Sequence, residues 1–477
     1  MNRREFLATS AMAPLVGGGA GAVAAADGDL TWLPAWRIRE AIVSGKLTAR
    51  AVTEHFLSRI ERLDPQLHAF RAIDAGEARE QARKADEALS RGEKPGLLHG
   101  VPIALKEHVA VKGMPSPNHG HRPGDVASID LSPVAEDSII AERLRKAGAI
   151  IVGVTIMPGM GIAPGMPDLA HHPRNPWNPD LAPGSSSAGS AAAVASAMTP
   201  VAIGGDGGGS TRLPSALCGV IGLHPTTGRV PNANYASPRL MLTSTFGPIT
   251  RDVRDAAIVL QAISGPDGRD ILSTVHPPAP DYTAQFARGA KGLKLGWTED
   301  FGFARKYFAP ETPEIVAQAH QAALGFERVG ARIETADIGL EDFWPHVATT
   351  MANYEGQPQP EAMMRAAMET RGRNRAKFDL LLERYDFILS VTAIYTAPSV
   401  EQWNANWKNQ NYPPIYTAET FMFNWLQLPA ISLPIGFYNN LPIGLQMVGR
   451  PDSEPRMLAA AAAFMAQFPQ TRRPKIS

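Results

Sequence analysis

Cysteine is nearly absent from this sequence, since Cys218 is the only one in 477 residues. A lone thiol cannot form an intramolecular disulfide or a cysteine-based metal site. Because Cys218 lies in an apolar stretch, we predict a small buried side chain rather than a nucleophile. The His119–His121 and His171–His172 clusters lack a matched carboxylate or third ligand, so we expect structural or surface roles for them. The sequence therefore predicts neither a metal nor a cofactor.

A surplus of charge of either sign is also missing. Lys and Arg together number 46, as do Asp and Glu, and no long run of like charge occurs. A nucleic-acid-binding protein normally carries a basic excess or a basic stripe, so we expect no nucleic-acid partner. The hydrophobic content of 44% is ample for a large buried core.

The N-terminus lacks the long, strongly apolar run that a membrane anchor requires. The pair Arg3-Arg4 precedes Phe6 and Leu7, and a Gly- and Ala-rich stretch follows and ends in small residues. This pattern resembles a twin-arginine export signal with an Ala-x-Ala cleavage region, the alternative being a basic tail. It predicts a signal over residues 1–26, no stable membrane anchor, and a mature protein in the periplasm or outside the cell. Because the twin-arginine route carries folded proteins, a chain without disulfides fits it.

Helical and strand-like patterns alternate along the rest of the chain. Residues 138–146 show helical spacing and an apolar run at 149–152 follows directly, which is typical of an α/β protein. Near the C-terminus, two apolar runs flank the pair Asn439-Asn440, a pattern that predicts a hairpin. The Pro-rich residues 264–283 indicate a surface connection and the place where a subdomain seam would fall. We predict one α/β domain over residues 27–477.

Two further helices are predicted, the first of them with clear boundary signals. Thr48 is a typical N-cap residue, apolar residues then recur at helical spacing, and Asp64-Pro65 predicts the end of that helix. Residues 361–384 form a charged region of helical character. These elements would alternate with the predicted strands.

Three segments carry the candidate chemistry, and the first ends at Lys106. An apolar run over residues 100–105 leads into this lysine, so its amine should be partly buried. Burial disfavours the charged form and lowers a lysine pKa, and a shift to near 7 requires roughly 4–5 kcal/mol. A neutral lysine can act as a general base, with the nearby His99 and His108 as candidates to tune it. The alternative is an ordinary surface lysine at the end of a strand.

The other two segments are rich in glycine and serine. Residues 183–190 are followed at once by an Ala/Val run, which favours a tight turn entering a buried helix over a flexible linker. Residues 203–214 contain a glycine run that ends at Ser210. Glycines permit unusual backbone conformations and let a carbonyl approach N–H groups closely, as an oxyanion hole requires. A phosphate-binding P-loop is excluded because no Gly-Lys-Ser/Thr sequence follows.

Together these segments resemble the amidase signature family. The family pattern is Gly-Gly-Ser-Ser-Gly-Gly-Ser, an Ala-rich stretch, and then Gly-Thr-Asp-x-Gly-Gly-Ser-x-Arg-x-Pro. The resemblance includes Lys106 and touches most of the mature chain, although residues 265–420 match only loosely. The other matching positions are Arg174-Asn175-Pro176-Trp177-Asn178, Gly247-Pro248, Arg254-Asp255 and Leu428-Pro429-Ala430-Ile431-Ser432-Leu433-Pro434.

The resemblance implies an α/β fold with a central, mixed, twisted sheet covered by helices on both faces. It also implies a Ser–cis-Ser–Lys triad that hydrolyses amide bonds, with Ser210 as nucleophile, Ser186 as proton relay and Lys106 as base. The cis peptide bond would be Ser185–Ser186. The implied oxyanion donors are the backbone N–H groups of Gly207, Gly208, Gly209 and Ser210.

Asp206 and Arg212 flank the nucleophile. We expect them to brace its loop through a charge-assisted hydrogen bond, the alternative being separate surface charges. The chain also departs from the family pattern without losing the triad, and the departures bear on substrate class. They are Ser185 and Ala188 in place of glycines, Gly205 in place of threonine, His224 in place of lysine, and the stretch 153–159.

We therefore predict an amidase that hydrolyses a small-molecule carboxamide through a seryl acyl-enzyme and releases ammonia or an amine. Three alternatives stay open: an esterase using the same triad, the ammonia-donating glutaminase subunit of a tRNA amidotransferase, and a non-catalytic ligand-binding protein. Predicted export argues against the second, whose partner and substrate are cytoplasmic, and the intact triad argues against the third. The oligomeric state stays open, a homodimer included. An acyl pocket or plain core packing is expected for residues 401–426, which include Trp403, Trp407, Met422 and Trp425.

Overall fold

The computed structural model describes most of the chain. Among the described helices, none combines the length and the apolar character that crossing a bilayer requires. The predicted export signal over residues 1–26 lies outside the described residues, as do His119, His121 and His171. The described residues are 30–116, 132–158, 172–232, 243–354, 358–408, 416–468 and 472–476.

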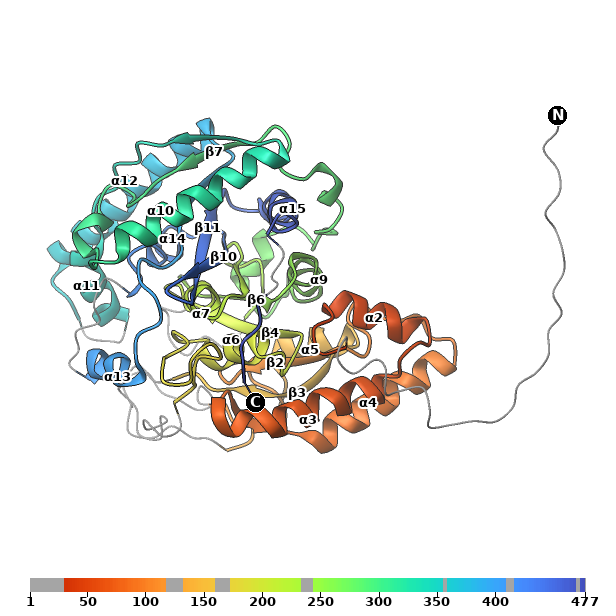
Figure 1. Cartoon of the computed structure of the whole chain (residues 1–477). Helices are drawn as coiled ribbons and strands as arrows, with labels where there is room; N and C mark the ends of the chain where they lie inside the picture. Colours follow the sequence, from red (N-terminus) through yellow and green to blue (C-terminus); the bar gives the residue numbers. More distant parts are fainter. Residues whose placement is uncertain are drawn as a thin grey trace, which may run out of the picture.

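A mixed sheet of eleven strands forms the centre of the described chain (Figure 1). Its order is β1-β3-β2-β4-β6-β5-β10-β11-β9-β7-β8. Parallel pairs join β2 to β3 and β4, and β7 to β8 and β9, whereas the other neighbours are antiparallel. The strands are β1 (Phe70–Ile73), β2 (Pro102–Lys106), β3 (Ile150–Thr155), β4 (Val201–Asp206), β5 (Ile221–His224), β6 (Thr245–Thr250), β7 (Lys294–Trp297), β8 (Arg332–Thr335), β9 (Phe387–Val391), β10 (Ala430–Tyr438) and β11 (Leu441–Val448).

Helices cover both faces of this sheet, as the α/β prediction required. Strand side chains point alternately to the two faces, so Ile103 and Leu105 of β2 join one apolar cluster and Ala104 joins another. α5 (Ile139–Lys146) and α9 (Val253–Ile263) pack in the first cluster, and α3 (Ala49–Leu67), α4 (Ala75–Ser90) and α6 (Ala188–Ala195) pack in the second. The remaining helices are α2 (Ala35–Val43), α7 (Arg212–Cys218), α10 (Thr312–Ala323), α11 (Trp344–Tyr354), α12 (Glu361–Arg384), α13 (Val400–Lys408), α14 (Phe421–Leu426), α15 (Glu454–Met465) and the short η1 (Ile271–Val275), η2 (Phe286–Arg288), η3 (Ala304–Tyr307) and η4 (Leu324–Val329).

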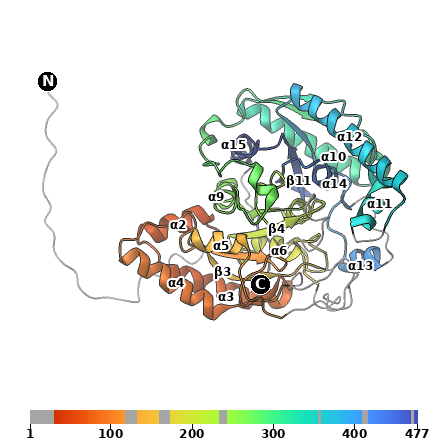
Figure 2. The same ribbon diagram turned by 180° about the vertical axis from the view of Figure 1, so that it is seen from behind.

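The helices divide between the two ends of the molecule. α2, α3 and α4 gather at one end and α10, α11 and α12 at the other, in both views of the ribbon (Figures 1 and 2). Between them lies α6, which is buried along its whole length and contacts β2, β3, β4 and β6. Small residues fit such a position, which explains the Ala/Val run after residues 183–190 and excludes a flexible linker there.

Two boundaries differ from the predictions. α3 begins after the Thr48 N-cap as expected, but it continues through Pro65 to Leu67. The Asp64 carboxylate accepts the backbone N–H groups of Ala69 and Phe70, so this side chain fastens the helix end beyond the proline. The Pro-rich connection over 264–283 contains the short helix η1, and strands from both sides of it belong to the same sheet.

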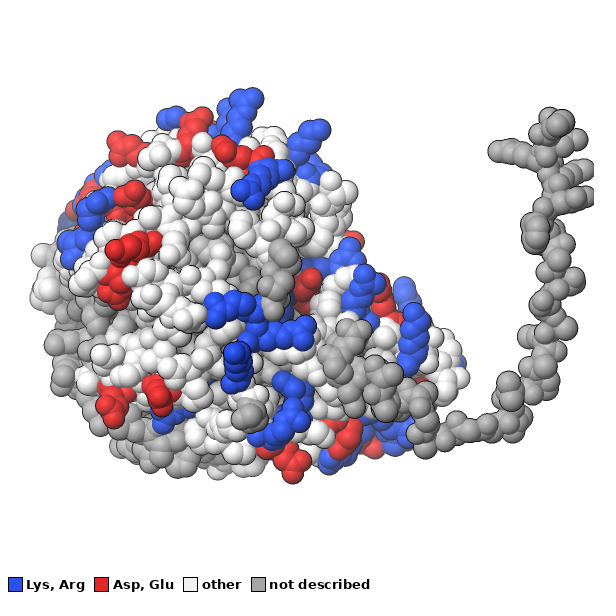
Figure 3. Space-filling model, viewed as in Figure 1, with Lys and Arg blue, Asp and Glu red and all other residues white. Residues whose placement is uncertain are grey.

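Charge on the surface is balanced overall but not evenly spread. Lys and Arg alternate with Asp and Glu around much of the face in Figure 3, while a group of Lys and Arg lies in the hollowed middle of that face.

Among the described cations, Arg37 and Arg254 stack over Trp36 at 4.0 and 4.7 Å. Trp36, Arg251 and Arg254 line a hollow of about 430 Å³. Because Arg251 follows β6 beside the start of β4, this hollow lies at the other end of the strands from Lys106.

Candidate active site

Lys106 ends β2 in the middle of one half of the sheet, with β3 and β4 as its neighbours. Its side chain is 1% exposed, so the sequence-based alternative of a surface lysine is wrong. The Nζ atom donates to Ser186 Oγ at 2.6 Å and to the Gly205 carbonyl oxygen at 3.1 Å. The structure therefore brings together the predicted base and the predicted relay.

The surroundings of Lys106 favour its neutral form. Burial lowers the pKa of Lys106 to about 7, although the carboxylates of Asp206 and Glu107 act in the opposite direction. A pKa near 7 leaves a large fraction of the amine uncharged at neutral pH. That fraction is able to accept a proton from a hydroxyl group that touches it.

Glu107 is a site residue that the sequence analysis missed. Its carboxylate is 1% exposed, and it accepts Arg71 Nε at 2.7 Å and the Met157 backbone N–H at 2.6 Å. These contacts tie the end of β2 to β1 and to the chain that follows β3. The sequence did contain a signal for Glu107, because this residue directly follows Lys106. A carboxylate buried beside a buried lysine needs hydrogen-bond partners of its own.

The two serine-bearing turns lie against each other. The Ser185–Ser186 peptide bond is cis, as the resemblance implies. Ser187 donates its backbone N–H to the Ser210 carbonyl at 3.0 Å, and its hydroxyl bonds to the Gly205 N–H and carbonyl. Ser186 and Ser210 are partly exposed, whereas Ser185 and Ser187 are buried. Of these serines, the two that the resemblance assigns to the triad are therefore the ones with exposed surface.

The predicted oxyanion donors do not all have the same environment. Gly209 is buried and donates its N–H to Asp206 Oδ1 at 2.6 Å. That hydrogen bond corrects the prediction for Gly209, because an N–H bound to a carboxylate is not available to an oxyanion. Gly207, Gly208 and Ser210 are partly exposed, and none of their N–H groups donates to a described residue. These three remain the candidate donors.

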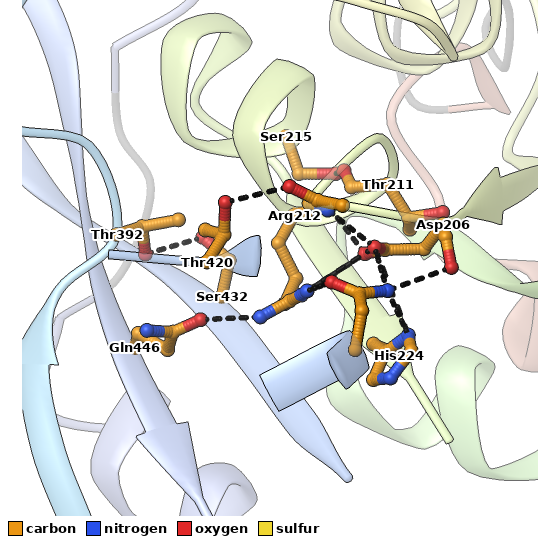
Figure 4. A network of polar contacts seen from close by, with 12 residues as sticks. Asp206, Thr211, Arg212, Ser215, His224, Thr392, Thr420, Ser432 and Gln446 are labelled. Atoms are coloured by element: carbon orange, nitrogen blue, oxygen red, sulfur yellow. Dashed lines mark hydrogen bonds and ion pairs between the residues drawn. The ribbon is translucent and has the colours of Figure 1, made fainter. Parts of the chain in front are cut away.

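Asp206 and Arg212 form a buried ion pair instead of two surface charges. Both side chains are inaccessible to solvent, and Arg212 contacts the two carboxylate oxygens at 2.9 and 3.1 Å (Figure 4). Burial alone would raise the pKa of Asp206, but Arg212 and its other polar neighbours hold it well below its usual range. Asn424 of α14 and Gln446 of β11 accept two further guanidinium N–H groups at 2.6 Å each. The pair thus links the loop that carries Ser210 to α14 and β11.

His108 is packed against Gly205 beside the lysine. Its ring lies 4.8 Å from that of Phe246, and burial lowers the pKa of His108 well below its usual value, with Lys106 acting in the same direction. A Cβ atom at Gly205 would lie only 2.4 Å from His108 Nε2. This contact explains why the family's threonine is replaced by glycine here: the imidazole occupies the space of the missing side chain.

Two other candidates from the sequence, Cys218 and His172, are buried and take no part in the hydrogen bonds of Lys106. Burial raises the pKa of the Cys218 thiol, which fits a buried small side chain. His172 is buried and its Nδ1 contacts the Pro173 carbonyl at 2.7 Å. No cluster of three or more metal-binding side chains occurs among the described residues. In the aromatic segment, Trp403, Met422 and Trp425 are buried in the larger core cluster, and no side-chain position is described for Trp407.

Comparison with known proteins agrees with this geometry. The chain matches the family model described as Amidase over residues 51–358 and 334–458. It is 31% identical to the glutamyl-tRNA(Gln) amidotransferase A subunit of Moorella thermoacetica, over 93% of this chain and 98% of that protein. It is 29% identical to an acylamidase of Rhodococcus erythropolis, over 92% and 96%. Among solved structures, it resembles a bacterial aryl acylamidase of the amidase signature family, with a TM-score of 0.76, 28% identity and coverage of 92% and 96%.

Proposed function

The chain belongs to the amidase signature family, and we propose that it hydrolyses its amide substrate with Ser210 as nucleophile, Ser186 as proton relay and Lys106 as base. It is an amide-hydrolysing enzyme, as its acylamidase relatives indicate. The observation that carries the assignment of roles is the 2.6 Å contact between a fully buried Lys106 Nζ and Ser186 Oγ.

The proposed reaction uses a proton relay through these three side chains. Neutral Lys106 accepts the Ser186 proton while Ser186 takes the proton of Ser210, whose oxygen attacks the substrate carbonyl carbon. The carbonyl oxygen becomes an oxyanion, stabilised by backbone N–H groups of the glycine loop. The relay then runs in reverse and protonates the leaving nitrogen, so that ammonia or an amine departs and an acyl-enzyme remains. Water hydrolyses the acyl-enzyme by the same relay.

Serine labelling tests the assignment of the nucleophile. A fluorophosphonate probe should modify the wild-type protein and the surface variant Ser90→Ala, but not Ser210→Ala. Ser210→Ala should remain folded and hydrolyse no amide in a substrate panel read by ammonia or amine release. Near-normal turnover by Ser210→Ala would exclude Ser210 as nucleophile, and labelling that persists in it would assign the reactive serine elsewhere. The same panel, extended to matched esters, measures the esterase alternative.

The similarity to amidotransferase A subunits supports a second candidate, the release of ammonia from glutamine within a complex. The purified chain should distinguish the two. An independent amidase turns over simple amides alone, whereas a glutaminase component prefers glutamine and gains activity only with its partners. The fold does not separate the two candidates, because relatives of both kinds cover almost the whole chain.

We further propose that the protein acts outside the cytoplasm as an exported amidase. The support is the Arg3-Arg4 pair with the Ala-rich region that ends near residue 26. Replacing both arginines by lysine should retain the protein in the cytoplasm, as measured by fractionation and immunoblotting, while a variant with Arg37 and Arg39 replaced in the same way should still be exported. Equal export of the twin-lysine variant would refute the proposal.

A further inference from the structure

Helix α14 packs on the loop that carries the nucleophile, although the two are far apart in sequence. Thr420, at the start of this helix, donates its hydroxyl to the Gly208 carbonyl oxygen at 3.0 Å, across 212 positions of chain. A Cβ atom placed on Gly209 would lie 2.1 Å from Thr420 Oγ1, and one placed on Gly208 would lie 2.5 Å from the Phe421 ring. The glycines are therefore needed for the approach of α14, and not only for the approach of a substrate.

Hydrogen bonds fix both ends of the peptide group between Gly208 and Gly209. The Gly208 carbonyl and the Gly209 N–H belong to the same planar peptide group. The carbonyl accepts the Thr420 hydroxyl and the N–H donates to Asp206 Oδ1. With both ends bound, this group cannot rotate without breaking a buried hydrogen bond. The adjoining peptide groups carry the N–H groups of Gly208 and Ser210, so their directions are set by the same restraint.

α14 is itself anchored to the ion pair under the loop. Asn424 Nδ2 donates to the Asp206 carbonyl and to its Oδ1, at 2.9 Å each. Gln446 Nε2 donates to the Glu419 carbonyl at 2.7 Å, directly before Thr420, and its other end accepts from Arg212 (Figure 4). The helix and the loop are thus one hydrogen-bonded unit, and Thr420 has little freedom to move away from Gly208.

From this geometry we infer that Thr420 is a positioning residue, whose hydroxyl orients the N–H groups of the oxyanion loop toward the developing charge. The inference rests on the proposed function, because it assigns Thr420 a part in the reaction of Ser210. The Thr420 hydroxyl should therefore stabilise the transition state, in which the oxyanion forms, more than it stabilises the bound substrate.

The test compares two valine substitutions in the same segment. Thr420→Val removes the hydroxyl and leaves the Gly208 carbonyl without this donor. Thr417→Val is the matched control, because Thr417 is also buried, lies three residues earlier, and its hydroxyl has no hydrogen-bond partner among the described residues. Thr420→Val should lower kcat about 10- to 100-fold with KM nearly unchanged. Thr417→Val should stay within about 3-fold of wild type, and Thr420→Ser, which keeps the hydroxyl, should recover most of the loss.

A transition-state mimic separates positioning from simple stability. A boronic acid that forms a tetrahedral adduct with the nucleophile should bind Thr420→Val more weakly by the same factor as the loss in kcat, while a ground-state amide inhibitor should bind unchanged. All rates are measured well below the melting temperature of each variant. If Thr420→Val does not fold, Thr420→Ala carries the same comparison.

Three outcomes overturn the inference: equal kcat for Thr420→Val and Thr417→Val, equal losses for Thr420→Val and Thr420→Ser, or a loss confined to KM. Each of these leaves the proposed function intact as long as Ser210→Ala is inactive. An active Ser210→Ala variant would instead refute the proposed function, whatever Thr420 does.

Discussion

Lys106 Nζ lies 2.6 Å from Ser186 Oγ, although the two residues are 80 positions apart in sequence. The lysine is buried at the end of a central strand, whereas the serine is partly exposed on a turn before α6. A proton can therefore pass from the hydroxyl of a partly exposed residue to a base that solvent does not reach. Desolvation lowers the pKa of the amine to about 7, and the contact with Ser186 still connects it to the partly exposed side of the site.

The rate should follow the neutral fraction of Lys106. Because burial lowers the pKa of Lys106 to about 7, kcat/KM for a non-ionisable amide should rise as pH increases through about 7 and then level off. The carboxylate of Glu107 raises this pKa, so Glu107→Gln should move the midpoint to lower pH. A rate–pH profile of each protein measures both effects. A midpoint near 10 would mean that the lysine is not desolvated.

The same pKa predicts how stability depends on pH. Lys106 has a pKa of about 7 in the folded chain and its ordinary value of 10.5 when unfolded, so between these values the unfolded chain binds more protons. The free energy of unfolding of wild type, relative to Lys106→Met, should therefore rise by up to about 1.4 kcal/mol per pH unit in that window. Urea unfolding at pH 7, 8 and 9 measures the difference. A constant difference would contradict the predicted pKa shift.

Removing Arg212 should be far more costly than removing an exposed arginine. Arg212→Met leaves Asp206 as a buried charge without its cation, a change that typically destabilises by roughly 3–5 kcal/mol. Arg373→Met breaks an exposed pair with Glu341 and should change the free energy of unfolding little. Chemical denaturation of both variants provides the comparison. Similar effects for the two would show that the Asp206–Arg212 pair contributes no more than a surface pair.

Gly205 and His108 should depend on each other. Gly205→Thr restores the family residue but places a Cβ atom 2.4 Å from His108 Nε2, so it should destabilise the fold and lower activity. His108→Ala makes room and should rescue the threonine variant. A double-mutant cycle should give a coupling above about 1 kcal/mol in favour of the double variant. Additive effects would show that the ring can move aside at little cost.

The Cys218 thiol should not react with alkylating reagents in the native protein. Its thiol is buried and burial raises its pKa, which suppresses the reactive thiolate. Iodoacetamide should leave the folded enzyme active and unmodified, and it should label the same protein in denaturant. Cys218→Ala should retain full turnover. Inactivation of the folded wild type by the reagent, but not of the alanine variant, would contradict a purely structural role.

Local patterns in the sequence were enough to predict many elements. The charged region over 361–384 is α12, and the Asn439-Asn440 pair joins β10 to β11 with both residues at positive φ. Such features follow from helical periodicity and turn chemistry, which act over a few residues. The resemblance to the amidase signature family assigned candidate roles to Lys106, Ser186 and Ser210, and the apolar run before the lysine predicted its partial burial.

Only the tertiary structure decided the contacts between distant segments. Nothing near Thr420, Asn424 or Gln446 in the sequence marks them as supports of the nucleophile loop. Local patterns are equally unable to predict the strand order, the hydrogen bond from the Gly209 N–H to Asp206, or the continuation of α3 through Pro65. The physical reason is that backbone preferences depend on neighbours in sequence, whereas the direction of a hydrogen bond and the burial of a charge depend on whatever the folded chain places within a few ångströms.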